Sequence, residues 1–443
     1  MAILSITFHT EEHKINDWNS FLEEELLEII KNFSRKYIIS EVESEMLSEG
    51  KNTNVLLFFD NQSDRIYFLE NELPHISNKI FEKYILNNGI EIRNRLVVAP
   101  MTLFVANEDG TFSDEDFKFM SKRGKNIGMF IVEATLVADG GKAFTRQPEA
   151  INETHLPSLR KVAEIIQKQG TKAILQIHHG GRLAIPAVNT NDITAPSYDE
   201  ETGAREMTVQ EISNLIEAFG NAADLAIQAG FDGVEIHGAN RYLIQQFYSG
   251  ITNRRTDEWG GSIEKRMKFP LAVIDEVNKV KNKHNADKFI IGYRFSPEEP
   301  GENGLTMVET FALIDELVKK PLQYLHVSLP DFYINAYRGG DTKKPAIQQI
   351  HDRINGKLPL IGVGNLYTGE QITKALDTGW AEFTALGKTV ILNHNIGTLI
   401  LEKRENEIET ELDLEREDKY DLGEFLWERA KEESPLLPPL KKK

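Results

Sequence analysis

Residues 230–247 read GFDGVEIHGANRYLIQQF, a short apolar run that changes abruptly into polar residues. Within it, Gly233–His237 has the length and apolar character of a buried strand, because parallel strands covered by helices read as nearly continuous apolar runs. His237, Asn240 and Tyr242 follow at the point where this strand ends. The segment therefore predicts one β/α unit with polar side chains at the carboxyl end of its strand.

The same alternation of strand and helix extends through most of the chain. Eight apolar runs are predicted to be buried parallel strands: Arg95–Ala99, Met129–Ala134, Lys172–His178, Gly233–His237, Phe289–Phe295, Tyr324–Ser328, Leu358–Val363 and Glu382–Leu386. Helical stretches lie between them, such as Leu156–Gln169, Val209–Gln228, Glu264–Lys281, Val308–Lys319 and Gly369–Asp377. Eight such units match an α/β fold of the (β/α)8 TIM barrel type with insertions. A doubly wound open sheet is the alternative, but no G-x-G-x-x-G follows the first strand.

The two ends of the chain differ from this pattern. Residues 1–76 predict a small α+β domain in the order β-α-β-β-α, with no catalytic constellation and an open role. Its elements are strands at Ala2–Phe8, Tyr37–Met46 and Asn54–Phe59, a turn at 48–52, and helices at Asp17–Phe33 and Ser63–Leu73. Residues 77–402 then form the barrel. Residues 403–443 predict an acidic helical extension with an exposed, Pro-rich tail from Ser434 to Lys443.

Composition limits the functions that this chain of 443 residues can have. It is 40% hydrophobic and 27% charged, which is typical of a soluble globular protein. Acidic residues outnumber basic ones 69 to 51, and the net charge of −18 argues against nucleic acid or an anionic membrane as partner. The absence of cysteine excludes disulfides, thiolate zinc sites and cysteine-ligated iron–sulfur clusters. No signal peptide or membrane helix is recognisable, so a cytoplasmic protein acting on a small molecule is predicted.

Barrels of this type gather their active site at the carboxyl ends of the strands, and this rule selects candidate residues. The selected set is rich in hydrogen-bond donors and poor in carboxylates, which suits an electron-rich or anionic ligand and not a metal ion. It comprises Pro100, Met101, Thr102, Ala134, Thr135, Gln176, His178, His179, Gly181, Arg182, His237, Asn240, Tyr242, Arg294, Ser296, Gly362, Gly364, Asn365, Gly387 and Lys388.

Two groups in this set suggest specific chemistry. Gly364, Gly387 and Lys388 follow the seventh and eighth strands, where barrels bind phosphate through backbone N–H groups; tight βα turns are the alternative explanation of the glycines. His237 and Asn240 are spaced to direct two donors at one carbonyl oxygen. A zinc site and a structural core histidine are the alternatives, and no nearby carboxylate completes a set of zinc ligands.

Arg294 lies within the apolar run Ile290–Phe295, and a buried guanidinium needs an anionic partner. One interpretation is that it stabilises negative charge developing on a bound ring. The alternative is an internal salt bridge with Glu133 or Glu235.

Five motifs carry a resemblance to a known family. They are IFEKYILNNGIEIRNRLVVAPMT at 80–102, QIHHGGR at 176–182, APS at 195–197, GFDGVEIHGANRYLIQQF at 230–247 and TNRRTDEWGGSIEKR at 252–266. In this order and spacing they resemble the Old Yellow Enzyme family of FMN-dependent ene-reductases and NADH:flavin oxidoreductases, from about Ile80 to about Ile400. The resemblance implies FMN as cofactor and NAD(P)H as hydride donor.

The resemblance also implies which residues bind the cofactor. They are Pro100, Met101, Thr102, Ala134, Gln176, Arg294, Gly364, Asn365, Gly387 and Lys388. Thr102 would bond the flavin carbonyl at O4, and Arg294 would lie against N1 and O2, where reduced flavin gathers charge. Gly364, Gly387 and Lys388 would hold the phosphate.

For the substrate, the resemblance implies that His237, Asn240 and Phe104 line its site and that Tyr242 donates a proton. Hydride would pass from NAD(P)H to FMN N5 and on to an electron-poor acceptor such as an α,β-unsaturated carbonyl. Three positions depart from the family pattern. Phe104 replaces a tyrosine, Lys388 replaces an arginine and loses its bidentate fork, and Arg241 replaces a glycine.

Two other functions are compatible with a barrel. A phosphate-binding isomerase or aldolase would need a Schiff-base lysine or a carboxylate base at a strand end, and the sequence places neither well. A flavin-binding barrel used as a regulatory or interaction module, with little turnover, is the second alternative. The N-terminal domain is compatible with homo-oligomerisation and does not decide between these functions.

Overall fold

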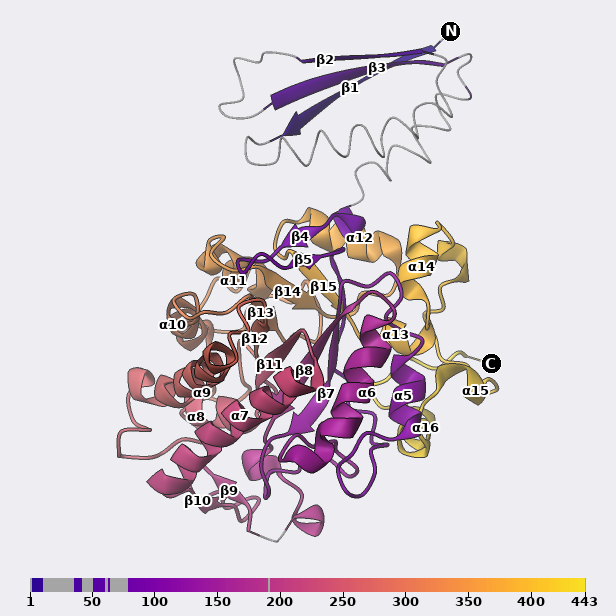
Figure 1. Cartoon of the computed structure of the whole chain (residues 1–443). Helices are drawn as coiled ribbons and strands as arrows, with labels where there is room; N and C mark the ends of the chain where they lie inside the picture. Colours follow the sequence, from indigo (N-terminus) through magenta and orange to yellow (C-terminus); the bar gives the residue numbers. More distant parts are fainter. Residues whose placement is uncertain are drawn as a thin grey trace. The chain divides into compact units, whose positions relative to one another are not determined.

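The computed structural model of this chain describes residues 2–10, 36–41, 51–59, 63, 79–189 and 192–442. The chain divides into two compact units, residues 1–78 and 79–443 (Figure 1). The larger unit contains every candidate site residue.

The smaller unit contains a three-stranded antiparallel sheet in the order β1-β3-β2. Its strands are β1 (Ala2–Thr10), β2 (Lys36–Glu41) and β3 (Lys51–Phe59). Strand β3 begins three residues earlier than predicted, inside the expected turn, because Lys51 and Asn52 pair with the end of β1. The two predicted helices lie outside the described residues, apart from Ser63.

The larger unit is a closed barrel of eight parallel strands, so the predicted (β/α)8 barrel is confirmed and the open sheet is excluded. The strands are β6 (Leu96–Val98), β7 (Met129–Leu136), β8 (Lys172–His178), β11 (Gly233–Gly238), β12 (Ile290–Phe295), β13 (Tyr324–Val327), β14 (Leu360–Val363) and β15 (Phe383–Leu386). Each coincides with one predicted apolar run. Strand β8 pairs with β11, and β15 pairs with β6, which closes the circle.

Helices follow the strands and surround the barrel (Figure 1). They are α5 (Asp114–Met120), α6 (Leu156–Gln167), α7 (Val209–Ala229), α8 (Leu243–Tyr248), α9 (Ile263–Lys283), α10 (Met307–Leu317), α11 (Ala346–Ile354), α12 (Gly369–Asp377), α13 (Lys388–Leu392) and α14 (Ile396–Leu401). Local sequence defines their ends. Thr208 and Glu211 form a capping box at the start of α7, and Gly230 ends that helix at a φ of 86°.

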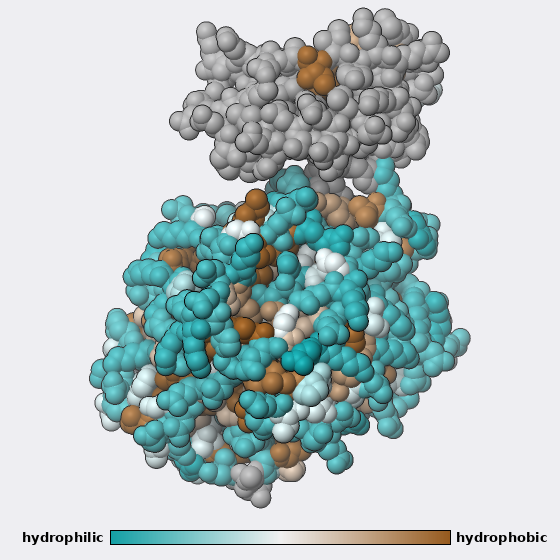
Figure 2. Space-filling model, viewed as in Figure 1, coloured by the Kyte–Doolittle hydropathy of each residue, from teal (hydrophilic) through white to brown (hydrophobic). Residues whose placement is uncertain are grey.

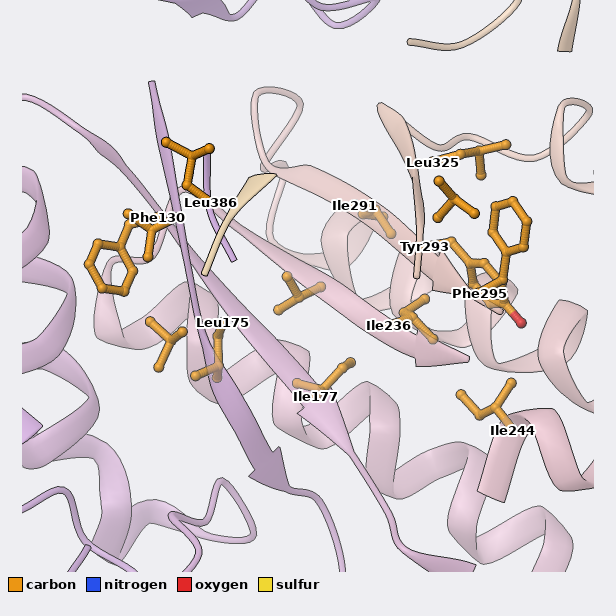
Figure 3. Close-up of a cluster of buried hydrophobic side chains, with 14 of the residues drawn as sticks. Phe130, Leu175, Ile177, Ile236, Ile244, Ile291, Tyr293, Phe295, Leu325 and Leu386 are labelled. Carbon is orange, nitrogen blue, oxygen red and sulfur yellow. The ribbon is translucent and has the colours of Figure 1, made fainter. Parts of the chain in front are cut away.

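Alternation along each strand separates two sets of side chains. Ile236 and Tyr293 belong to the hydrophobic cluster that the strands share with the surrounding helices, part of which Figure 3 shows. Their neighbours in sequence point to the other face of the strand, into the barrel. The interior is apolar near the beginnings of the strands, where Met129, Ile174 and Ile290 cluster with Leu86 and Ile92. Leu86 and Ile92 belong to the short hairpin of β4 (Tyr84–Ile85) and β5 (Glu91–Ile92): Leu86 follows β4, and Ile92 ends β5. Polar groups are therefore left for the carboxyl ends.

The C-terminal segment contains helices, as the sequence predicts, but its tail is less exposed than expected. It contains the single turn η8 (Glu405–Glu407) and the short helices α15 (Glu417–Tyr420) and α16 (Glu424–Lys431). Leu412, Tyr420, Trp427 and Leu437 are buried, and Leu412 pairs with Leu440. The segment is thus packed on the barrel, and the tail is only partly exposed. Apolar anchors inside a charged sequence explain the difference.

The visible surface of the barrel unit is mostly hydrophilic, with hydrophobic residues in small groups (Figure 2). Among the described helices, none combines the length and the apolar character that crossing a bilayer requires.

Candidate active site

The register of the barrel strands brings together polar residues that lie far apart in the sequence. Glu235 on β11 lies opposite Gln176 on β8. His237 lies opposite Arg294 on β12, and Arg294 lies opposite His326 on β13. All five side chains are buried. Because they alternate with residues of the outer cluster, they point into the barrel near the carboxyl ends of its strands.

Glu235 is the buried anion of this group. Its carboxylate accepts hydrogen bonds from Gln176 Nε2 at 2.7 Å, from Tyr324 Oη at 3.1 Å and from His326 Nδ1 at 2.9 Å. Burial by itself would raise the pKa of Glu235, but His326 and Arg294 together hold that pKa below its usual value. The carboxylate also orients the amide of Gln176, whose Oε1 is turned away from Glu235.

Arg294 is less completely satisfied. Its Nη2 donates to Ser328 Oγ at 3.2 Å, and its buried Nε has no hydrogen-bond partner among the described residues. Among the described residues, neither Glu133 nor Glu235 forms an ion pair with it, because Glu133 accepts from Leu103 N and the partners of Glu235 lie on β8 and β13. The guanidinium therefore retains donor capacity for a ligand. Burial lowers the pKa of Arg294, yet arginine stays charged at neutral pH.

Asn240 lies in the loop after β11 with a φ of 57°. Its Oδ1 accepts from Ser328 Oγ at 2.9 Å, and its backbone N–H donates to Ser296 Oγ at 2.9 Å. The exposed side-chain amide is thus held with its carbonyl oxygen toward β13, which turns its Nδ2 donors the other way. Arg294 and Asn240 are linked through the single hydroxyl of Ser328.

His178, His237 and Tyr242 form a cluster of rings. The ring centroids lie 5.1 Å apart for His178 and His237, 4.5 Å for His178 and Tyr242, and 5.3 Å for His237 and Tyr242. His237 Nδ1 accepts from Ala239 N at 3.3 Å, and His178 Nδ1 lies 3.0 Å from the amide Nε2 of Gln147, which can only donate. Both imidazoles therefore carry their hydrogen on Nε2. That of His178 is buried without a described partner.

These three rings are uncharged at neutral pH. Burial, aided by His178 and Arg294, lowers the pKa of His237 well below its usual value. Burial, aided by His179, lowers the pKa of His178 to about 3. Burial raises the pKa of Tyr242 to about 12. The cluster consequently offers neutral hydrogen-bond donors, and no member of it competes for a proton.

The loop after β6 carries the predicted residues Pro100, Met101 and Thr102, all half-buried. A side chain of β7 holds this loop, because the backbone N–H of Leu103, which follows Thr102, donates to Glu133 Oε2 at 2.9 Å. Ala134 on β7 is fixed in turn, since its carbonyl oxygen accepts from Gln147 Nε2 at 2.9 Å. These two hydrogen bonds fix the loop after β6 and the end of β7 beside the ring cluster.

The loops after β14 and β15 hold the predicted phosphate residues. Gly364 has a φ of 130°, and a Cβ there would lie 2.6 Å from the backbone of Asp331 and Phe332, so only glycine fits. Asn365 donates from Nδ2 to Asp331 Oδ2 at 3.2 Å. Gly387 precedes α13, whose first residue is Lys388. A Cβ on Gly387 would touch Met101 Sδ at 3.5 Å, which brings this loop next to the one after β6.

Side chains of the motifs at 230–247 and 252–266 hold the loops around the site in place. Gln245 Oε1 on α8 accepts from Arg241 N at 2.9 Å, and Gln246 Nε2 donates to Gly180 O at 2.9 Å, so one short helix ties the loops after β8 and β11 together. Arg255 donates to the carbonyl oxygens of Pro196 and Met207 at 2.9 and 2.6 Å. In the motif at 252–266, Arg255 therefore supports the loop that follows β9 (Thr194–Ala195) and the segment before α7.

Several residues at this site are not predicted from the sequence. They are Gln147, Phe144, Tyr324, His326, Ser328 and Phe425. Strand alternation could have found Tyr324, His326 and Ser328, because these positions share one face of the predicted strand Tyr324–Ser328. The others lie in loops or in the C-terminal segment, where no periodicity marks a direction. Phe104 is at a strained φ of 60° and contacts Phe144, with ring centroids 5.6 Å apart.

The residues present fit a flavin mononucleotide. An electron-rich planar ring needs donors that the protein leaves unused, and Arg294 Nε and His178 Nε2 are such atoms. A phosphate needs close backbone approach and a counter-charge, which Gly364 and Lys388 can supply. A closed barrel with these unused donors at its mouth suits an enzyme that binds a planar, phosphorylated cofactor.

Comparison with known proteins gives the family. The model of the NADH:flavin oxidoreductase / NADH oxidase family matches residues 79–407. The chain belongs to this family, which is that of Old Yellow Enzyme, and the predicted family, FMN cofactor and NAD(P)H dependence are confirmed. It is an NAD(P)H-dependent flavin oxidoreductase.

Individual relatives differ in how much of them the chain covers. The probable NADH-dependent flavin oxidoreductase YqiG of Bacillus subtilis (strain 168) is 44% identical over 354 residues, 79% of this chain and 95% of that protein. The NADH:acrylate oxidoreductase of Vibrio harveyi is 38% identical over 320 residues, which are 70% of this chain but only 32% of that protein. The solved structure of morphinone reductase has a TM-score of 0.62 at 26% identity, covering 74% of this chain and 90% of that one.

Proposed function

We propose that the chain reduces the carbon–carbon double bond of small acceptors in which that bond is conjugated to a carbonyl group. The supporting observation is the set of neutral donors around the ring cluster. His237 carries its hydrogen on Nε2, and Asn240 has its amide carbonyl tied to Ser328. Two such donors suit the oxygen of a polarised carbonyl, which gains negative charge as the double bond is reduced. A location in the cytoplasm is compatible with a chain without cysteine.

The cofactor would be held by the residues that the resemblance implies. These are Pro100, Met101, Thr102, Ala134, Gln176, Arg294, Gly364, Asn365, Gly387 and Lys388. Bound FMN supplies the two-electron chemistry, taking reducing equivalents from NAD(P)H and passing them to the acceptor. Arg294 contributes a fixed positive charge that favours an anionic ring, and Lys388 neutralises part of the phosphate charge.

Three side chains bind the acceptor and supply its proton. His237 and Asn240 bind and orient the acceptor's carbonyl oxygen and draw charge onto it. Tyr242 donates a proton to the α-carbon, since a phenol with a pKa of about 12 remains protonated at neutral pH. Because His237 is neutral, its hydrogen bond stabilises the oxygen without transferring a proton to it.

The double variant His237→Ala/Asn240→Ala tests this proposal. We expect it to retain FMN, judged by its visible absorbance, and to reduce cyclohexenone about 10²- to 10³-fold more slowly than the parent. The control is His284→Ala/Asn285→Ala, a histidine–asparagine pair at the end of α9 outside the barrel mouth. An unchanged rate of enone reduction in the first variant would reject the assigned roles. Bound flavin without turnover of NADH or NADPH in the parent would indicate a regulatory module instead.

A further inference from the structure

The family model ends at residue 407, yet the chain continues and returns to the active site. Helix α16 buries Leu426, Trp427 and Ala430 in the main hydrophobic cluster. Phe425 lies beside these residues but is 45% exposed. Its ring is instead packed on Phe104, with the centroids 4.3 Å apart and the planes inclined by 32°. A residue outside the family pattern thus contacts a predicted substrate residue.

Phe425 begins a row of rings that reaches the proposed proton donor. Phe104 contacts Phe144 at 5.6 Å between centroids, and Phe144 contacts Tyr242 and His178, each at 5.7 Å. We call Phe425, Phe104 and Phe144 the aromatic row. None of these three side chains carries a hydroxyl, so the whole row is apolar. One wall of the approach to Tyr242 is therefore built from aromatic faces and edges.

The position of Phe425 is fixed by the residues just before α16. A Cβ on Gly423 would lie 2.2 Å from Val105 Cγ1, so the chain passes directly against the residue after Phe104. Just before it, the buried carboxylate of Asp421 pairs with Lys118 at 2.9 Å and with Lys122 at 2.8 Å, at the end of α5. These contacts attach the segment to the barrel and bring one half-exposed ring to the mouth of the site.

We propose that Phe425 is a specificity-determining residue, which together with Phe104 forms the outer wall of the acceptor site and favours acceptors with a flat apolar group attached to the reacting double bond. The inference rests on the proposed function. An aromatic substituent that extends from the double bond toward the aromatic row gains ring contacts and leaves water. A small acceptor that binds only at His237 and Asn240 does not reach Phe425.

The test compares two acceptors that share one reacting group, but-3-en-2-one and 4-phenylbut-3-en-2-one. The parent, Phe425→Ala and Phe425→Leu are reduced anaerobically, and reoxidation by each acceptor is followed by stopped flow to give a dissociation constant and a limiting rate. Leu436→Ala is the control, because Leu436 is an exposed apolar residue of the same segment, at 80% exposure. Flavin content and melting temperature are measured for every variant.

For Phe425→Ala we expect the dissociation constant of the phenyl compound to rise about three- to tenfold, with that of but-3-en-2-one and both limiting rates unchanged within about twofold. Phe425→Leu is expected to lie between Phe425→Ala and the parent, and Leu436→Ala to match the parent. Equal changes for both acceptors, or none for either, would overturn the inference and leave the proposed function intact. A parent that neither acceptor reoxidises would reject the proposed function, and the inference with it.

Discussion

Burial raises the pKa of Tyr242 to about 12 and lowers that of His237 well below its usual value. Tyr242 therefore keeps its proton, and His237 stays neutral, throughout the range from about pH 6 to pH 9. We expect reoxidation by an enone to be independent of pH in this range. Tyr242→Phe should lower the limiting rate by about 10²-fold or more at every pH, with little effect on the dissociation constant. Stopped-flow profiles measure both quantities, and an inflection near pH 6.5 in the parent would contradict the neutral state of His237.

Glu235 is the residue on which the barrel interior depends for stability. Its folded-state pKa lies below the unfolded value, so its contribution to stability is present above about pH 4.5 and is lost as the pH falls through the folded pKa. Glu235→Ala removes the acceptor of three buried donors and should lower the free energy of unfolding by about 3–5 kcal/mol at neutral pH. Glu235→Gln keeps part of the bonding and should cost less. Urea denaturation measures the losses, which should shrink in acid; a loss for Glu235→Ala below about 1 kcal/mol would refute this role.

At the scale of the element, the loop after β11 holds two consecutive left-handed residues, Asn240 at a φ of 57° and Arg241 at 62°. Asparagine tolerates this conformation, whereas arginine pays about 1–2 kcal/mol for it. Arg241→Gly removes that strain but increases the entropy of the unfolded chain, which offsets about 0.4–1 kcal/mol. We expect the variant to be more stable by up to about 1.5 kcal/mol in chemical denaturation. Arg241→Ala is the control, since it removes the cation and keeps the strain; a glycine variant less stable than the alanine variant by about 0.4–1 kcal/mol would show that the backbone is relaxed.

The strands could be predicted from the sequence more completely than the C-terminal helices and the long loops. The eight strands were predictable because a strand buried on both faces must be mostly apolar. Each therefore appears in the sequence as a short apolar run, such as Tyr324–Val327. The helix α16 was not predicted in place, because Leu426, Trp427 and Ala430 are too few among charged residues to mark a buried side. Gln147 and Phe144 lie in a long loop after β7, and only the folded chain reveals that they contact His178.

The site also has a part that could be predicted from the sequence and a part that could not. Residues at strand ends, such as His237 and Arg294, could be selected because parallel strands present their carboxyl ends at one edge. What could not be predicted is how the donors are oriented. The tautomer of His237 depends on a backbone N–H two residues away, and the direction of the Asn240 amide depends on Ser328, which is 88 positions distant. Both contacts depend on how the loops after the strands fold, and a single sequence does not reveal them.

At the scale of the whole molecule, the division at residue 78 leads to a prediction about the smaller unit. The family model begins at residue 79, and all the predicted site residues lie between Pro100 and Lys388. We therefore expect a chain that begins at Lys79 to retain FMN and to reduce cyclohexenone within about twofold of the full chain, because binding and orientation of the acceptor involve residues of the barrel.

A slightly shorter chain, beginning at Tyr84, is the matched control. It lacks Ile80, which is fully buried in the barrel's hydrophobic cluster and whose carbonyl oxygen accepts from Arg95 N at 2.7 Å. Loss of a buried isoleucine alone costs about 2–5 kcal/mol, so this chain should melt well below the one that begins at Lys79. Calorimetry and flavin absorbance compare the two. If the chain beginning at Lys79 melted like the full chain but lost its flavin or most of its activity, residues 1–78 would have to be assigned a direct part in the site.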